Sequence, residues 1–162
     1  MLTIEQSIFG TYLLHLEYVY APGEAVLPDQ EQQMTNLLSF VAADWPYESD
    51  GVASHMELAD AASMVAWLTA NAEQLRAVGF SIQQALDKPY YVGTVTIRDN
   101  YTDARGQLHE QQELLLRDGV SVPLQDVLDA ISRGATEFLL PTGDTLIIPI
   151  QQIMDYVNPS SL

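Results

Sequence analysis

The residues of this chain that could do chemistry are few and far apart. Its three histidines, His15, His55 and His109, are widely separated, and none belongs to an HExxH motif, in which two histidines one helical turn apart bind a metal. The chain has no cysteine, which removes thiolate nucleophiles, disulfides and thiolate metal sites together. The sequence therefore predicts no metal centre built on histidine or cysteine.

Paired carboxylates are the other candidate for catalysis. Asp126 and Asp129 lie one turn apart on a predicted helix, but general acid/base work needs one carboxyl in a buried setting that shifts its pKa. Both fall on the polar face of that helix, so we interpret them as solvated. The sequence also has no GxSxG elbow, no G-x-G-x-x-G loop and no phosphate-binding G-x-x-x-x-G-K-[ST]. We expect no cofactor and no enzymatic activity.

Two aromatic residues in an acidic loop are the best candidates for an interaction surface. Trp45 and Tyr47 belong to the segment 44–53, which is rich in proline, glycine and acidic residues. Large aromatic side chains on loops often anchor protein interfaces. The alternative is that both fold back over neighbouring helices and fill the edge of the core.

The charge of the chain restricts its partners. Six Lys and Arg residues stand against 22 Asp and Glu, which gives a net charge of −16 over 162 residues. Nucleic-acid binding depends on neutralising phosphates with Lys and Arg, so direct binding is not expected. The acidity indicates either a solvated surface or a face that meets a basic partner. No apolar stretch is long enough to span a bilayer and no signal peptide is evident, so we expect a soluble, cytoplasmic protein without membrane contact.

The first half of the chain changes from strand to helix patterning. Alternation from Phe9 to Tyr20 predicts a long strand, and Glu24 to Leu27 would be a short return strand after the break at 21–23. Apolar spacing from about Gln30 predicts a helix.

A second helix is the most strongly patterned element of the sequence. Ser54 and Glu57 form a capping box, which places the start of the helix at Ser54. Gly79 supplies a left-handed stop, and Phe80 stands where a Schellman motif places its closing apolar contact.

The second half is predicted to consist of hairpins and short helices. Tyr90 to Ile97 is typical of a strand, with Gly93 at a bulge or a close backbone approach, and Gln107 to Arg117 is interpreted as its antiparallel partner. Six residues in the run 120–149 are expected to fix the backbone. Their expected positions are the first turn of a helix, the end of that helix, a strand, two places in a turn and the start of a last helix. They are, in that order, Pro123, Gly134, Phe138, Pro141, Gly143 and Pro149.

These elements predict the α+β class, with a mixed, mainly antiparallel sheet of hairpins packed against three or four helices. Residues 1–158 would form a single domain, with two lobes, 1–87 and 88–158, as the alternative. Residues 159–162 are expected to be a frayed tail or the point where a longer protein was cut.

The order of motifs from Lys88 to Tyr156 resembles a known family. The match is carried by ten residues: Val122, Pro123, Leu124, Gly134, Phe138, Leu140, Pro141, Gly143, Ile148 and Pro149. The helix from Trp67 to Phe80 also fits. The pattern is similar to the accessory region N-terminal to the motor in bacterial helicase-like ATPases of the Swi/Snf family. The chain departs from that family at 106–109 and 151–153, where aromatic residues are often found.

The resemblance implies a non-catalytic, helicase-associated accessory domain that contacts the motor of its own polypeptide or a protein partner. A free-standing acidic adaptor that binds through Trp45 and Tyr47 is the alternative.

Overall fold

The computed structural model describes residues 1–18, 20, 22–48, 51–99, 101–102, 104–109 and 111–158. The chain folds into two compact units, Met1–Pro89 and Tyr90–Leu162. This division falls two residues from the boundary of the predicted two-lobe alternative. The predicted tail at 159–162 lies outside the described residues. Helices and mostly antiparallel sheets confirm the α+β class.

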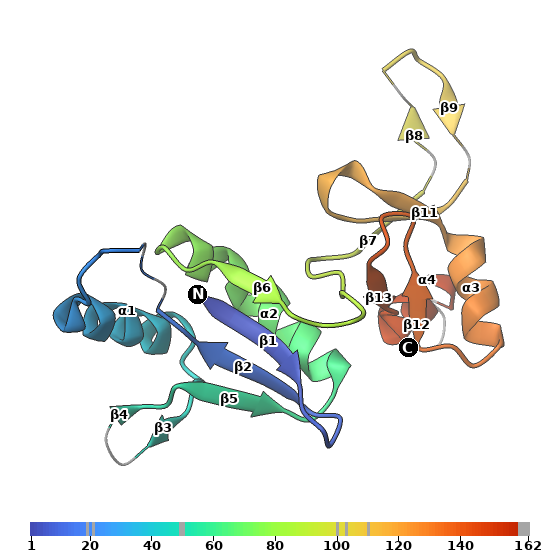
Figure 1. Ribbon diagram of the computed structural model, residues 1–162. Helices are drawn as coiled ribbons and strands as arrows, with labels where there is room; N and C mark the ends of the chain where they lie inside the picture. The colour runs from blue at the N-terminus through green and yellow to red at the C-terminus, as the bar shows by residue number, and fades with distance from the viewer. Residues whose placement is uncertain are drawn as a thin grey trace. The chain divides into compact units, whose positions relative to one another are not determined.

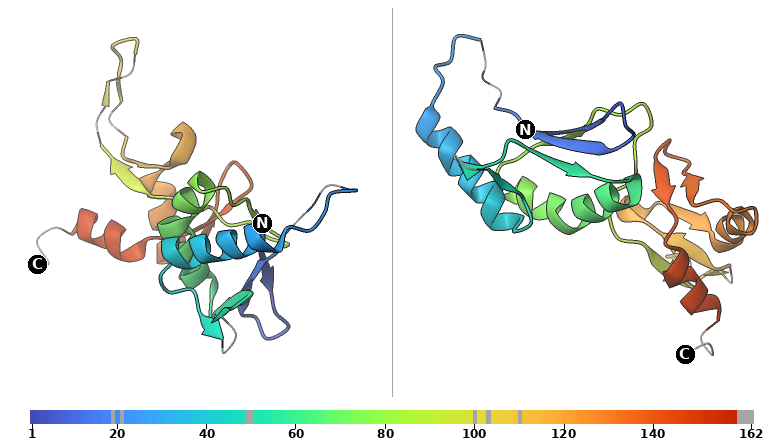
Figure 2. Two further views of the ribbon diagram at one scale, coloured as in Figure 1. Left: turned by 90° about the vertical axis from the view of Figure 1, so that its left-hand side faces the viewer. Right: turned by 90° about the horizontal axis from the view of Figure 1, so that it is seen from below.

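The first unit contains one four-stranded sheet and two long helices (Figure 1). In chain order its elements are β1 (Leu2–Gln6), β2 (Tyr12–Leu16), α1 (Pro28–Val41), β3 (Tyr47–Glu48), β4 (Gly51–Val52), β5 (His55–Leu58), α2 (Ala61–Ala77) and β6 (Ile82–Gln84). The sheet has the order β5-β2-β1-β6, in which β6 is parallel to β1 and the other neighbours are antiparallel. Figure 2 shows α2 lying along one face of this sheet, and α1 contacts α2.

Alternating apolar residues explain how the sheet packs. Leu2 and Ile4 of β1 and Leu14 of β2 are fully buried, and they face one side because successive side chains of a strand point to opposite faces. The helices cover this side with Leu38 of α1 and Leu68 of α2. Burial of each such side chain contributes about 1.5–3 kcal/mol.

The sequence prediction was wrong at three places in this unit. It missed β1, although Leu2 and Ile4 alternate with polar residues. The long strand predicted from Phe9 to Tyr20 spans only Tyr12–Leu16, and no strand occupies 24–27.

The capping box was also wrong. His55–Leu58 is a strand, paired with β2 from Tyr12 to His15, because its backbone groups complete the sheet edge and Met56 is buried. The helix begins instead at Ala61. Its N-cap is Asp60, whose carboxylate accepts a hydrogen bond from the amide of Ser63 at 2.8 Å.

The predicted end of α2 is confirmed in detail. The amide of Phe80 donates to the Leu75 carbonyl at 3.0 Å and that of Gly79 to the Arg76 carbonyl at 3.1 Å, which together form a Schellman motif. Gly79 has a φ of +109°, which only glycine adopts readily. Phe80 is buried.

The second unit is built from short hairpins around its own core. Its elements are β7 (Thr96–Arg98), β8 (Tyr101–Thr102), β9 (Leu108–His109), β10 (Glu113–Leu115), a 3₁₀ turn (Arg117–Gly119), β11 (Ser121–Pro123), α3 (Leu124–Ser132), β12 (Glu137–Leu139), β13 (Thr145–Ile147) and α4 (Ile150–Val157). A three-stranded antiparallel sheet has the order β11-β10-β7, and β12 pairs with β13. The strands predicted at 90–97 and 107–117 were too long, and their predicted pairing occurs only between β7 and β10, where Ile97 lies opposite Leu114.

Five of the six structural residues of 120–149 take the backbone positions expected of them, whereas Pro123 was expected in the first helical turn and is instead the last residue of β11, just before α3. Pro123 caps α3, Gly134 follows it with a φ of +83°, and Pro149 precedes α4. Phe138 is a residue of β12. Pro141 and Gly143 lie in the β12–β13 turn, which is closed by a 2.8 Å hydrogen bond from the Leu140 amide to the Asp144 carbonyl. No helix in the described part of the chain is both long and apolar enough to cross a membrane.

Gly93 gives a test of the second unit. A Cβ at this position would lie 2.8 Å from the Tyr91 hydroxyl, which donates to the Thr94 carbonyl and accepts from the Arg117 amide, each at 2.8 Å. Its φ of +149° also excludes most side chains. We expect Gly93→Ala to lower the free energy of unfolding by about 1–3 kcal/mol in urea titrations.

Gly119→Ala is the matched control, because its φ is +76° but a Cβ there would meet nothing within 4 Å. We expect the Gly93 variant to be the more destabilised of the two. Equal losses would show that the close approach to Tyr91 is unimportant.

Candidate binding pocket

Trp45 is a core residue. It is 1% exposed, its indole N–H donates to the Ala53 carbonyl at 2.7 Å, and its ring centroid lies 5.9 Å from that of Trp67. The Trp67 indole in turn donates to the Asp44 carboxylate at 3.0 Å. These contacts attach the acidic loop to α2. For Trp45 this agrees with the alternative prediction, in which the aromatic residues fill the edge of the core. Trp45 is therefore too buried to contact a partner.

Tyr47 is exposed, with 67% of its surface accessible. It lies in β3, and its hydroxyl contacts that of Ser39 in α1. Part of the acidic loop, residues 49 and 50, lies outside the described residues. Of the two predicted interaction residues, the structure leaves only Tyr47 accessible.

The described polar candidates lie apart from one another, on different elements or on a solvated face. Asp126 and Asp129 are exposed on α3, and Asp129 accepts a hydrogen bond from Gln125 at 2.9 Å. The rings of His15 and His55 lie 6.2 Å apart on paired strands, a proximity that follows from sheet register. The side chain of His109 lies outside the described residues, and no group of three metal-ligating side chains occurs among those described.

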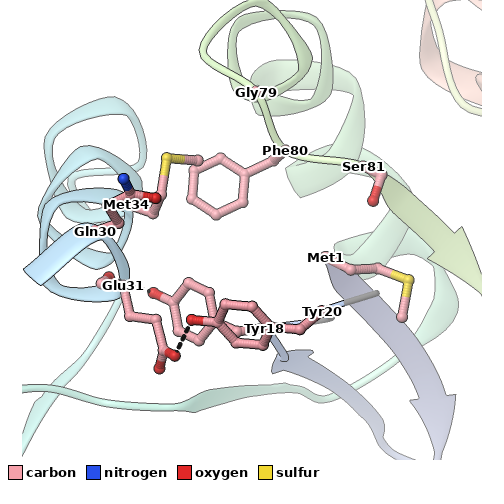
Figure 3. Close-up of a pocket in the computed structure, with 9 residues that line it drawn as sticks. All are labelled: Met1, Tyr18, Tyr20, Gln30, Glu31, Met34, Gly79, Phe80 and Ser81. Atoms are coloured by element: carbon pink, nitrogen blue, oxygen red, sulfur yellow. Dashed lines mark hydrogen bonds between the residues drawn. The ribbon is translucent and has the colours of Figure 1, made fainter. Parts of the chain in front are cut away.

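A pocket of about 520 Å³ in the first unit is the candidate functional site (Figure 3). Four separate segments line it: the chain's first residue, the chain after β2, the first half of α1, and the turn from α2 into β6. The lining residues are Met1, Tyr18, Tyr20, Gln30, Glu31, Met34, Gly79, Phe80 and Ser81.

Tyr18 and Tyr20 hold α1 against this pocket. The Tyr18 hydroxyl donates to the Glu31 carbonyl at 2.7 Å and also contacts Thr35, while the Tyr20 hydroxyl donates to the Glu31 carboxylate. The amide of Leu27 donates to the Tyr20 oxygen at 3.3 Å. Both phenols are thus tied to the first turns of α1, which fixes the positions of their rings.

The opposite wall is set by the Schellman turn. Gly79 reverses the chain so that Phe80 faces the pocket, and the Ser81 carbonyl accepts a hydrogen bond from the Leu2 amide at 2.8 Å. Figure 3 shows Phe80 and Met34 on one side of the pocket and Tyr18 and Tyr20 on the other. The Glu31 carboxylate lies at one end, beside the Tyr20 hydroxyl.

The contact between Tyr20 and Glu31 changes the pKa of Tyr20. Its hydrogen bond to the Glu31 carboxylate raises the pKa of Tyr20 above the usual 10.0, and desolvation adds to the increase. The phenol therefore stays protonated and continues to donate to Glu31 throughout the physiological range.

Sequence reasoning missed this pocket. Tyr18 and Tyr20 were assigned to one long strand, and Phe80 was recognised only as the closing apolar contact of a Schellman motif. The alternation of two tyrosines shortly before a helix with glutamate in its first turn was the available signal. Nothing in the spacing of the four segments predicts that they meet.

No family model, curated protein or solved structure matches the chain at a significant level. The function must therefore be inferred from the residues themselves.

Trp45 gives a test of the acidic loop. We expect Trp45→Phe to lower the free energy of unfolding by about 1–3 kcal/mol, because the buried Ala53 carbonyl loses its donor. Tyr47→Phe, which changes an exposed residue of the same loop, should stay within about 0.5 kcal/mol of the parent protein. Urea unfolding followed by tryptophan fluorescence measures both. Equal stability of the two variants would contradict the anchoring role of Trp45.

The Tyr20–Glu31 contact predicts a distinctive pH titration. Because the raised pKa reflects a neutral phenol favoured by the fold, this contribution to stability is fully present below about pH 10 and is lost as the pH rises through the folded pKa. We expect the ring NMR signals of Tyr20 to titrate at higher pH than those of a free tyrosine. Glu31→Gln should move the midpoint down, whereas Asp29→Asn, which removes a charge from the same helical turn, should not.

Proposed function

We propose that this chain is a non-catalytic, protein-binding module that acts in the cytoplasm as an accessory domain of a larger bacterial Swi/Snf-type helicase-like ATPase. Its contacts are with the motor of the same polypeptide or with a protein partner, and not with DNA. The observation that carries the binding role is an apolar tip on the β1–β2 hairpin.

The tip presents two large apolar side chains to solvent. Ile8 and Phe9 are 94% and 85% exposed, at positions of a tight turn where polar residues and glycine are usual. Desolvating such a pair favours association with an apolar surface by about 25 cal/mol for each Å² buried.

The turn itself is rigid. Ser7 accepts a hydrogen bond from the Gly10 amide on its carbonyl at 3.1 Å and donates its own amide to Thr11 at 2.8 Å. Its hydroxyl oxygen also accepts from the amide of Phe9 and contacts the Thr11 hydroxyl. Because this turn is already ordered, little conformational entropy is lost when a partner binds it.

Two further features support the role of an accessory domain. Almost all the residues that carry the resemblance to the Swi/Snf family lie within the second unit. There the six structural residues described above act as turn, cap or strand residues, and none supplies a catalytic group. The net charge of −16 suits docking to a basic protein surface and opposes direct binding to the DNA on which such motors work.

Two experiments test the proposal: sequencing of the gene beyond this chain, and a binding measurement with the motor. We expect the gene, read beyond Leu162, to encode a motor with Walker motifs. The purified motor should bind this chain in isothermal titration calorimetry, and Ile8→Asp should weaken the complex about tenfold or more, because a buried apolar anchor would become charged.

Val26→Asp is the matched control, since Val26 is 63% exposed but lies outside the tip, and it should leave the affinity unchanged. A stop codon after Leu162 with no motor gene would refute the accessory role and favour the free-standing acidic adaptor. Unchanged binding by the Ile8 variant would exclude the tip as the contact.

A further inference from the structure

The pocket lined by Tyr18, Tyr20, Glu31 and Phe80 has a chemistry that the accessory role does not use. Three aromatic rings and the thioether of Met34 supply its walls. Aromatic ring faces carry partial negative charge, and they attract cations placed within about 6 Å of the ring centroid. Methionine adds a polarisable apolar surface to the same cavity.

Among the described lining residues, the charged side chain is negative, like the ring faces. Glu31 contributes a carboxylate that accepts one hydrogen bond from Tyr20, and no Lys, Arg or His is among the described residues that line the pocket. The amine of Met1 is directed to the Glu17 carbonyl at 2.7 Å, and burial lowers its pKa. With a net charge of −16 on the chain, the pocket disfavours anions and attracts cations.

The type of cation follows from the number of hydrogen-bond acceptors. A primary ammonium group has three donors and is strongly hydrated, and a guanidinium has five donors in a plane. Apart from the Glu31 carboxylate, which already accepts from Tyr20, the side-chain acceptors of the lining are neutral oxygens of Gln30, Ser81 and the two tyrosines, so such groups would exchange their water for weaker partners. A methylated ammonium has a positive charge spread over apolar methyl groups and needs no such acceptors, which matches ring faces and thioethers.

We propose that this pocket binds a methylated ammonium group, held between Phe80 and the two tyrosines with Glu31 as its counter-charge. The group is found both on free small molecules and on methylated lysine side chains. The proposal depends on the pocket alone and does not require the hairpin tip or an ATPase partner.

Choline and its uncharged isostere, 3,3-dimethylbutan-1-ol, provide the test. The two molecules have the same shape and differ in the central atom and its charge. In NMR titrations of the full chain, we expect choline to shift the signals of Tyr18, Tyr20 and Phe80 and to bind about tenfold more tightly than the alcohol. Equal affinities, or shifts outside the pocket only, would overturn the proposal without bearing on the accessory role.

Matched variants assign the effect to the pocket. Glu31→Gln should weaken choline binding about fivefold or more while leaving the alcohol unchanged, because it removes a charge and keeps the size of the side chain. Asp29→Asn removes a charge from the same turn of α1 outside the pocket lining and should change neither affinity. If both variants lost choline affinity equally, the effect would be general electrostatic attraction to the acidic chain, and the proposed site would be refuted.

A further experiment distinguishes the two sources of the methylated ammonium group, a small molecule and a methylated lysine. A short peptide with trimethyllysine that binds more tightly than choline, and more tightly than its unmethylated form, would identify a protein side chain as the ligand. Binding of choline without binding of the peptide would identify a free small molecule. Failure of both ligands at millimolar concentration would refute the proposal.

Discussion

The left-handed turn at Gly79 is the constraint on which the first unit depends. Its Schellman hydrogen bonds end α2, bury Phe80 and direct Ser81 toward the first strand, where β6 then pairs in parallel with β1. A parallel neighbour requires a crossover connection, and α2 with this turn completes it. The same geometry makes one wall of the pocket. Stability of the sheet and shape of the candidate site therefore follow from one backbone conformation that a non-glycine residue would strain.

Tyrosine hydroxyls provide the second constraint. After β2 the chain leaves the sheet, and Tyr18 and Tyr20 make their hydrogen bonds to α1 through Glu31. A phenol can bury its ring and still satisfy its polar end, which is why tyrosine suits this junction. The result is a pocket whose rings are held in place before any ligand arrives, and whose single carboxylate agrees in sign with the acidity of the whole chain.

A helix in the second unit ends with the same hydrogen-bond pattern. Gly134 closes α3 through hydrogen bonds from its own amide to Ile131 and from Ala135 to Ala130, the pattern seen at Gly79. Proline and glycine fix the β12–β13 hairpin and the start of α4 around a core that includes Leu114, Val127 and Ile153. In this unit the proline and glycine residues therefore set the backbone around the core.

Local signals determined much of the fold. Glycine stops, proline starts and apolar periodicity act over a few residues, so the ends of α2 and α3, the β12–β13 hairpin and the start of α4 could be predicted from sequence. Where pairing between distant strands decided the outcome, prediction failed: Ser54 and Glu57 resemble a helix cap, yet the neighbouring segment completes a sheet edge. The burial of Trp45 and the pocket around Glu31 were also decided by tertiary structure, because residues far apart in the chain meet only when the sheet and helices pack.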